Sequence, residues 1–350
     1  MSLLDLPSEI LLWVLECLGA SFFRDDIGRL TVCKRWYGVA HHIFYADIEL
    51  QAGTLSKLFA HPSLPTRAHL FKHSLKILTV ELRGFMDWNR VCIQDLDDGN
   101  IQPYIDSWTS SINNNLSKLA AYIHEGKVLR TLRFTAWSEF TPIFPTLPRR
   151  DYLYFDTIFN FLSLDSLTVL ELDTCGSHFI HYGVSQSQSG RQRHICQHIA
   201  ALLPQLHCLR LRLREICPLA LQPQGEDTPY LKSVIVNLSL SNEPSDITSA
   251  SYSRRCGSSE RPGFLQLRSD MEDQATRLAG HMSYPVIVRV LFHPHNGCSS
   301  LGWKQQYLDV LTGKRAMLEP SIPWDEDGET EPEDSGEESD TYGTSPGSDS

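Results

Sequence analysis

The sequence lacks the features that mark several large classes of protein. It has no uncharged apolar run of about 18 residues, so no transmembrane helix is expected. Its apolar start, residues 3–18, is interrupted by three carboxylates and follows no basic segment, unlike a secretory signal peptide. Basic residues are not in excess either, with 31 Lys and Arg against 42 Asp and Glu. We therefore expect no membrane partner and no nucleic-acid partner.

Paired cysteines and familiar catalytic motifs are also missing. None of the nine cysteines is spaced C-x-x-C, and Cys17, Cys33, Cys175 and Cys208 lie in apolar runs. This usage predicts reduced, buried thiols in the cytoplasm, the nucleus or both. The sequence contains no H-E-x-x-H, no Walker A and no Rossmann glycine pattern. A non-enzymatic protein without a cofactor is therefore expected.

Histidine spacing offers weak metal candidates. His194, Cys196 and His198 are close in sequence, but residues two apart on a helix point to different sides. The two histidines alone would then lack a third ligand. His293 and His295 are expected to cap a loop at the end of a strand. The sequence therefore predicts no metal site.

Acidic residues are concentrated at the C-terminal end. Residues 319–350 hold twelve of the 42 and no Lys or Arg, which leaves 30 acidic residues against 31 basic ones elsewhere. Few apolar side chains and strong self-repulsion predict a disordered tail, with Trp324 as the last large side chain that can dock on the body. Ser335 and Ser345 resemble kinase acceptor sites. A passive, solvated tail is the alternative to a phosphorylated or partner-binding one.

Three short helices are predicted at the N-terminal end. The first begins at residues 6–9, where proline is tolerated and a glutamate suits the helix dipole, and it stops at Gly19. The others are expected at about residues 25–34 and 36–44. The first helix is apolar around most of its circumference, and about 45 residues are too few to cover it. The surplus apolar surface predicts a partner interface.

The same residues resemble the F-box. Residues 6–10 (LPSEI) match that family's L-P-x-E-[IL], and residues 32–36 (VCKRW) match its V-[CS]-[KR]-x-W element. The resemblance covers about residues 4–48, with a longer linker at residues 19–24. It implies docking onto the Skp-family linker subunit of a cullin-based SCF ubiquitin ligase. By resemblance, the residues that make or support this contact are Leu6, Pro7, Ile10, Leu11, Leu15, Leu18, Leu30, Val32, Cys33 and Trp36. The alternative is an ordinary helical cap.

Downstream, the phrase L-x-x-L-x-L recurs, and its alternating apolar positions predict strands with one buried face. The expected strands cover residues 75–82, 129–134, 167–172, 206–213, 231–238 and 285–292. Helical patterns occupy residues 112–124, 151–164, 194–203 and 271–282. The alternation resembles a leucine-rich repeat, although the first five phrases are separated by 54, 38, 39 and 25 residues instead of about 20–29. An α/β domain with a parallel sheet is the alternative.

The sequence thus predicts an α/β chain in three parts. These are a three-helix F-box module (residues 1–48), an irregular leucine-rich-repeat-like βα solenoid (49–318) and a disordered acidic tail (319–350). Segments 185–193 and 241–263 are expected to be unordered insertions, which often carry recognition. The resemblance implies a non-catalytic adaptor that binds a ligase and an unidentified target protein. A scaffold outside a ligase is the alternative.

Overall fold

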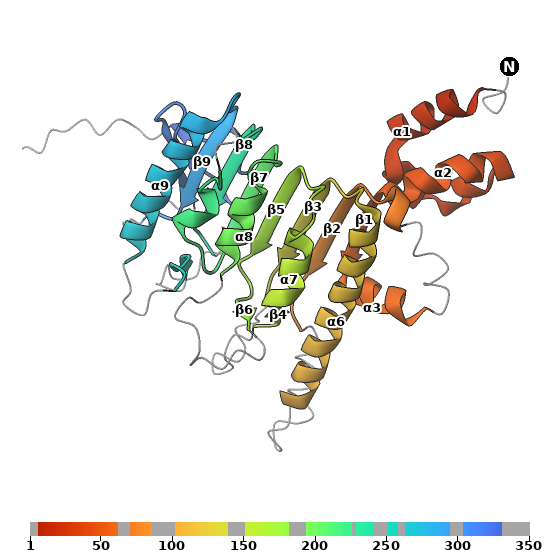
Figure 1. Cartoon of the computed structure of the whole chain (residues 1–350), viewed down its shortest axis with the longest axis horizontal. Coiled ribbons are helices and arrows are strands. Elements are labelled where there is room, and N and C mark those ends of the chain that lie inside the picture. Colours follow the sequence, from red (N-terminus) through yellow and green to blue (C-terminus); the bar gives the residue numbers. More distant parts are fainter. Residues whose placement is uncertain are drawn as a thin grey trace, which may run out of the picture.

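The protein is a mixed α/β chain in which a mostly parallel sheet carries helices along one face (Figure 1). The computed structural model describes residues 6–61, 71–85, 102–138, 151–181, 194–225, 229–240, 251–257, 263–294 and 304–330. Within these ranges the predicted α/β class is confirmed. Among the helices they contain, none is both long and apolar enough to cross a membrane.

The N-terminal helices pack around a small core of their own. They are α1 (Ser8–Asp25), the 3-10 helix η2 (Ile27–Thr31) and α2 (Lys34–Ala46). Their shared core consists of Leu11, Leu15, Phe23, Leu30, Trp36, Ala40 and Ile43. The rings of Phe23 and Trp36 meet edge to face with centroids 6.4 Å apart. The Trp36 indole N–H also donates to the Arg29 carbonyl at 2.6 Å, so one side chain links α2 to η2.

Gly19 divides α1 into two helical segments. Its φ of 74° lies in the left-handed region that glycine adopts without strain, and the helix resumes beyond it. Ala20 is buried, and Phe23 belongs to the core of the N-terminal helices and holds the resumed turns in place. The predicted stop at Gly19 agrees with its non-helical backbone, but residues 20–24 are helical, so the predicted linker is wrong there. The second helix was predicted at about residues 25–34, but only the five residues of η2 form a helix of their own there. The helix cannot continue because Cys33 is extended and caps the start of α2.

Seven of the described strands run parallel and follow chain order across the sheet. They are β1 (Asp47–Gln51), β2 (Ile77–Leu82), β3 (Thr131–Ala136), β5 (Val169–Thr174), β7 (Cys208–Leu213), β8 (Ser233–Asn237) and β9 (Ile287–Phe292). Pairing aligns the recurring phrases, so that one buried row contains Leu78, Leu132, Leu170, Leu209, Val234 and Val288. The six predicted strands are confirmed. Their alternation sends every second side chain into the core.

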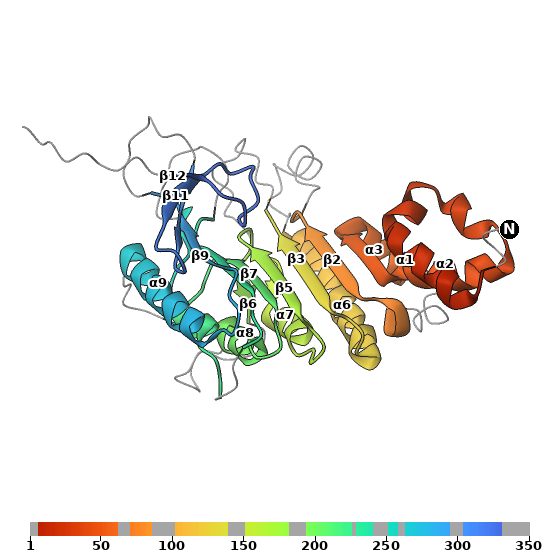
Figure 2. The same cartoon turned by 90° about the horizontal axis from the view of Figure 1, so that it is seen from above.

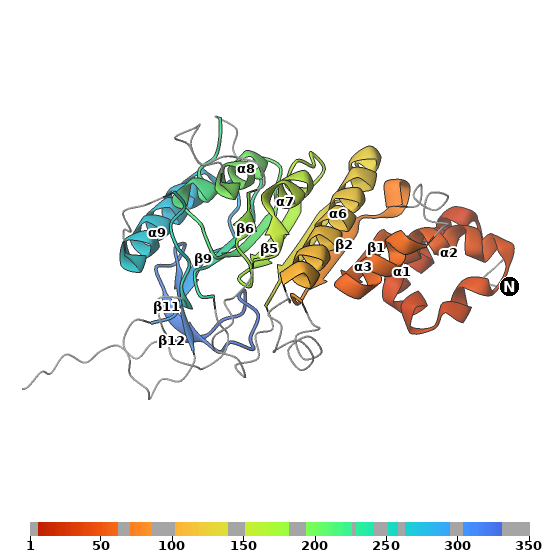
Figure 3. The same cartoon turned by 90° about the horizontal axis from the view of Figure 1, so that it is seen from below.

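A layer of helices covers one face of this sheet (Figure 3). Its members are α3 (Ala52–Ala60), α6 (Gln102–Gly126), α7 (Phe155–Leu162), α8 (Ile195–Leu202), η3 (Pro218–Leu221) and α9 (Phe264–His281). The four predicted helices are confirmed as α6, α7, α8 and α9, with shifted bounds. Their unequal lengths contribute to the irregular phrase spacing, since α6 has 25 residues and η3 only 4. A short pair, β4 (Leu153–Tyr154) and β6 (Phe179–Ile180), lies beside α7.

The N-terminal helices join the sheet without an intervening residue. Helix α2 ends at Ala46 and β1 begins at Asp47, so the predicted boundary at residue 48 falls inside a strand. The Lys76 backbone N–H donates to the Ala46 carbonyl at 2.7 Å. Lys76 also forms an ion pair with Glu16 at 3.5 Å, which connects α1 to the residue that precedes β2.

The C-terminal part adds an antiparallel extension to the sheet. It consists of β10 (Gln305–Asp309), β11 (Arg315–Leu318) and β12 (Glu329–Thr330). Figure 2 shows β11 and β12 on the opposite side of the sheet from α7 and α8. Ile322 and Trp324 pack there against a separate apolar cluster that contains Ile235 and Tyr307. The predicted disordered tail is therefore wrong for residues 319–330, because these side chains bury apolar surface.

Part of a predicted insertion is also ordered. Residues 251–257 lie inside segment 241–263, and the Ser253 backbone N–H donates to the Leu238 carbonyl at 2.9 Å. Tyr252 is buried and contacts the ring of Phe264 at the start of α9. The predicted insertion at 185–193 lies outside the described residues, as do Ser335 and Ser345.

Candidate functional site

An apolar stripe is exposed along α1. Ile10, Trp13 and Leu18 are 43%, 71% and 41% exposed, respectively. Ile10 and Trp13 are three positions apart and share one side of α1, whereas Leu18 lies nearer the side of Leu11, seven positions before it. Leu11 and Leu15 lie on that second side and are fully buried. The first helix thus uses one face for its own core and leaves a second apolar face uncovered in the isolated chain.

The ten residues predicted to form the linker-binding interface divide into two groups. Leu11, Leu15, Leu30 and Trp36 are buried in the core of the N-terminal helices. Pro7, Ile10, Leu18 and Val32 are exposed, and Leu6 and Cys33 are half-buried. The first group can support an interface only through the fold, whereas the others can touch a partner.

Three exposed apolar side chains of the N-terminal helices were not among the predicted contacts. Trp13, Ile27 and Tyr37 are each more than half exposed. The Arg35 guanidinium donates to the Leu6 carbonyl, which brings the start of α2 to the start of α1. Helical spacing from Ile10 is the sequence signal that could have identified Trp13.

The face of the sheet opposite the helices, from here the open face, is polar over β2, β3 and β5. One row across it reads Thr79, Arg133, Glu171, Arg210, Ile235 and Arg289. Neighbouring charges pair across strands, with Arg133 Nε and Glu171 Oε1 3.3 Å apart. Arg133 is exposed and Glu171 half-buried, so this part of the open face is accessible to a partner.

The C-terminal segment covers the open face at β7 and beyond. Arg212 is nearly buried, and its Nε lies 2.9 Å from Asp173 Oδ1 on the adjacent strand. The Trp324 ring lies over the Arg212 guanidinium, 5.0 Å from its centre. Arg210 pairs with Asp325 at 2.6 Å. The accessible part of the open face therefore ends where residues 319–330 begin to cover it.

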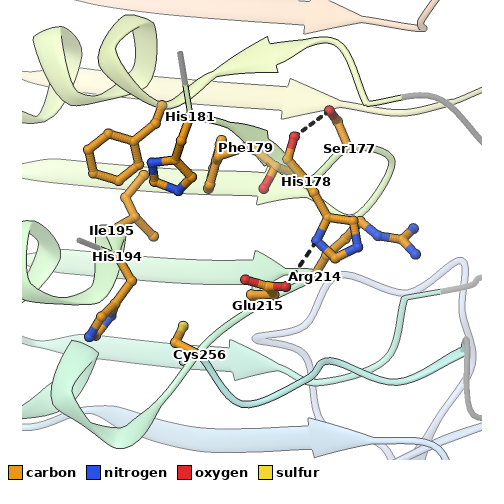
Figure 4. A pocket seen from close by; sticks show the side chains of 11 residues that line it. Ser177, His178, Phe179, His181, His194, Ile195, Arg214, Glu215 and Cys256 are labelled. Carbon is orange, nitrogen blue, oxygen red and sulfur yellow. Dashed lines mark hydrogen bonds and ion pairs between the residues drawn. The ribbon is translucent and has the colours of Figure 1, made fainter. Parts of the chain in front are cut away.

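A small polar pocket lies at the ends of β5 and β7 (Figure 4). Its lining includes Ser177, His178, Arg214 and Glu215 on one side and His194 on the other. His178 Nδ1 lies 3.5 Å from Glu215 Oε1, and Arg214 donates to the Cys175 carbonyl at 3.0 Å. The pocket lining therefore contains a positively charged side chain, Arg214, and a negatively charged one, Glu215.

Burial lowers the pKa of His178 below 6.5, although the nearby Asp151 carboxylate opposes the shift. The Asp151 side chain also accepts a hydrogen bond from the His178 backbone N–H at 2.7 Å. The imidazole is therefore held mainly neutral near neutral pH and can either donate or accept a hydrogen bond.

Three thiols and an imidazole converge beside this pocket. The donor atoms of His194, Cys196, Cys217 and Cys256, from here the Cys/His cluster, all lie within 4.8 Å of one another. The sulfur atoms of Cys196 and Cys256 are 3.7 Å apart. Cys217 Sγ is likewise 3.7 Å from His194 Nδ1. Such a group of soft donors is typical of a metal centre.

Three separate segments position the Cys/His cluster. His194 is the extended residue that precedes α8, and Cys196 lies in its first turn. Cys217 precedes η3, and its backbone N–H donates to Cys196 Sγ at 3.3 Å. Cys256 belongs to residues 251–257, which are held by the hydrogen bond from the Arg254 N–H to the Arg214 carbonyl at 2.8 Å.

The cluster favours a thiolate. Hydrogen bonds from Cys196 and Cys256 hold the pKa of the Cys217 thiol far below its usual range. A hydrogen bond with Cys217 raises the pKa of Cys196, and burial adds to that rise. The hydrogen bond to Cys217 also raises the pKa of His194. The thiolate is the form in which cysteine binds metals.

The structure separates the metal candidates of the sequence. His194 and Cys196 belong to the Cys/His cluster, but His198 packs edge to face on Phe159 with centroids 4.5 Å apart. The helix argument against His194 and Cys196 was wrong, because His194 is extended and lies before α8. The prediction that Cys17 is buried is also wrong, since this thiol is exposed. Cys175 is buried as predicted.

Comparison with known proteins adds no assignment. No family model matches the chain, and no curated protein matches it.

Proposed function

We propose that the protein is a non-catalytic adaptor whose N-terminal helices bind the Skp-family linker subunit of a cullin-based ubiquitin ligase. In this role the sheet domain recruits an unidentified target protein. The F-box resemblance of residues 6–36 suggests the identity of the partner. The exposed apolar side chains of α1 provide a surface on which it could bind. The regular order of strands and helices agrees with the proposed solenoid-like arrangement, an irregular relative of leucine-rich repeats.

The observation that carries the proposal is the apolar stripe of α1. Ile10, Trp13 and Leu18 expose large side chains on a helix whose other face is buried. An aromatic residue flanked by aliphatic ones is typical of the centre of a protein interface. The buried residues Leu11 and Leu15 hold this face in place and need not touch the partner.

The open face over β2, β3 and β5 is the surface we propose for the target. Its alternating charges, such as Arg133 beside Glu171, favour a partner with complementary charges. Catalysis is assigned to other ligase subunits.

Co-purification with the Skp-family linker tests the proposal. The informative variant is Ile10→Glu with Trp13→Glu, which places charge in the stripe without disturbing the buried face. Its matched control is Tyr284→Glu with Val286→Glu, since both of those side chains are also strongly exposed but lie before β9. We expect the first variant to weaken linker binding at least about 30-fold and the control to bind like wild type.

Unchanged binding by the folded Ile10/Trp13 variant would refute the interface. A folded wild-type chain that binds no linker would refute the ligase role. Recovery of the cullin in the wild-type complex separates the ligase adaptor from the alternative, a scaffold that binds the linker outside a ligase.

A further inference from the structure

The Cys/His cluster joins segments that are distant in sequence. Cys196 and Cys256 are separated by 60 positions, yet their sulfur atoms lie 3.7 Å apart. A disulfide needs about 2.05 Å between sulfur atoms, so these thiols are not bonded to each other. Cys196 and Cys217 are almost fully buried, and thiols gathered in this way require a physical reason to be close.

The spacing of the donors matches tetrahedral coordination. Zinc–sulfur bonds are about 2.3 Å long, which places two sulfur ligands of a tetrahedron about 3.8 Å apart. The distance of 3.7 Å between the sulfur atoms of Cys196 and Cys256 agrees with this edge. The 3.7 Å from Cys217 Sγ to His194 Nδ1 is close to the sulfur–nitrogen edge of about 3.6 Å, which is shorter because zinc–nitrogen bonds are shorter. The remaining donor separations are all within 4.8 Å, at most about 1 Å longer than the sulfur–sulfur edge.

We propose that the Cys/His cluster binds one Zn²⁺ ion in a closed structural site. Three thiolates and an imidazole are a known zinc ligand set, and four protein ligands leave no position for a substrate or a reactive water. Ca²⁺ and Mg²⁺ prefer oxygen ligands and do not suit this site. Bound zinc holds all three cysteines as thiolates, so Cys196 and Cys256 release their thiol protons, while His194 binds as the neutral imidazole.

The ion would fasten three elements together at one end of the sheet. It connects the start of α8, the turn before η3 and residues 251–257. A cross-link between Cys196 and Cys256 closes a long loop, which restricts the unfolded chain. His194 immediately follows the predicted insertion 185–193, and Cys256 lies in the predicted insertion 241–263. The metal would therefore hold His194 and residues 251–257 beside the pocket that His194 and Cys256 help to line.

Metal analysis of the purified full chain tests this site. The chain is purified under reducing conditions without chelator, and its zinc and iron contents are measured by mass spectrometry. We expect one zinc per chain in the wild type and a loss of most of it in Cys256→Ser and in His194→Ala. Cys208→Ser is the matched control, because Cys208 is a half-buried thiol on β7 outside the cluster, and it should retain the zinc.

A second measurement on the wild type does not depend on whether the variants fold. Cobalt added to the metal-free chain should produce the visible absorption of tetrahedral thiolate coordination, and zinc should abolish it. Bound zinc should also protect three thiols from a thiol reagent. A folded wild-type chain without zinc that gives no such cobalt spectrum would overturn the proposal. So would iron in place of zinc, or a disulfide between Cys196 and Cys256 in the freshly purified protein.

Discussion

The ring of Trp324 lies over the guanidinium of Arg212, 5.0 Å from its centre. Arg212 is nearly buried and is neutralised by Asp173 on the next strand. Burial of an arginine is costly unless it is paired, so the indole and the carboxylate together make this arrangement stable. The contact ties the C-terminal segment to the open face.

Trp324→Ala should release residues 319–330 from the sheet. We expect a loss of about 2 kcal/mol in the free energy of unfolding, because the change removes apolar burial and a cation–π contact. Urea unfolding measures the loss, and limited proteolysis should then cleave within this segment. Tyr284→Ala is the control, since that side chain is 81% exposed and should change stability by less than about 0.5 kcal/mol. Equal effects of the two substitutions would contradict the docking role.

Leu15→Ala should act on the N-terminal helices through their fold. Leu15 is fully buried in a core of only a few side chains, so its truncation should cost about 3 kcal/mol. Hydrogen exchange should show that residues 8–46 open more readily while the sheet beyond β2 is unaffected. The folded Ile10→Glu and Trp13→Glu chain should keep its exchange protection. If Leu15→Ala leaves exchange in the helices unchanged, the proposed supporting role of the buried group is wrong.

His178 should make stability depend on pH. Burial holds its folded pKa below 6.5, so the unfolded chain takes up a proton before the folded chain does. The stability due to the neutral imidazole is present above pH 6.5 and is lost as the pH falls through the folded pKa. Urea unfolding on both sides of pH 6.5 should therefore show a steeper acid loss for wild type than for His178→Gln. Parallel pH profiles would rule out this contribution. Acid release of a bound metal affects both proteins alike.

Much of the sheet could be predicted because its signal is local. Strands such as β5 and β7 alternate leucine with polar residues, and only an extended chain places those leucines on one face. β1 was missed because its five residues include two acidic ones and overlap the end of the predicted F-box module. β12 was missed because an acidic composition suggests disorder, whereas its pairing with β11 depends on the distant apolar contacts of Trp324.

The candidate sites also differ in whether a local sequence pattern can predict them. The apolar stripe around Ile10 could be expected from helical spacing, although the sequence does not show which face of α1 is buried. The Cys/His cluster has no local spacing motif, because Cys217 and Cys256 approach His194 only when the strands are in register. Sequence reasoning also placed His194 on a helix, where its ring would point away from Cys196. Its extended backbone removes that objection.

The direct passage from Ala46 in α2 to Asp47 in β1 sets the angle between the N-terminal helices and the sheet. Arg24 pairs with Asp47 at 3.3 Å, and His42 Nδ1 lies 2.8 Å from Ser74 Oγ, so side chains brace the joint from both sides. A protein bound at the stripe of α1 and another bound at the open face would be held at a set distance and orientation. The chain would then act as a rigid spacer, and the reach of a ligase assembled on it would be determined by this joint.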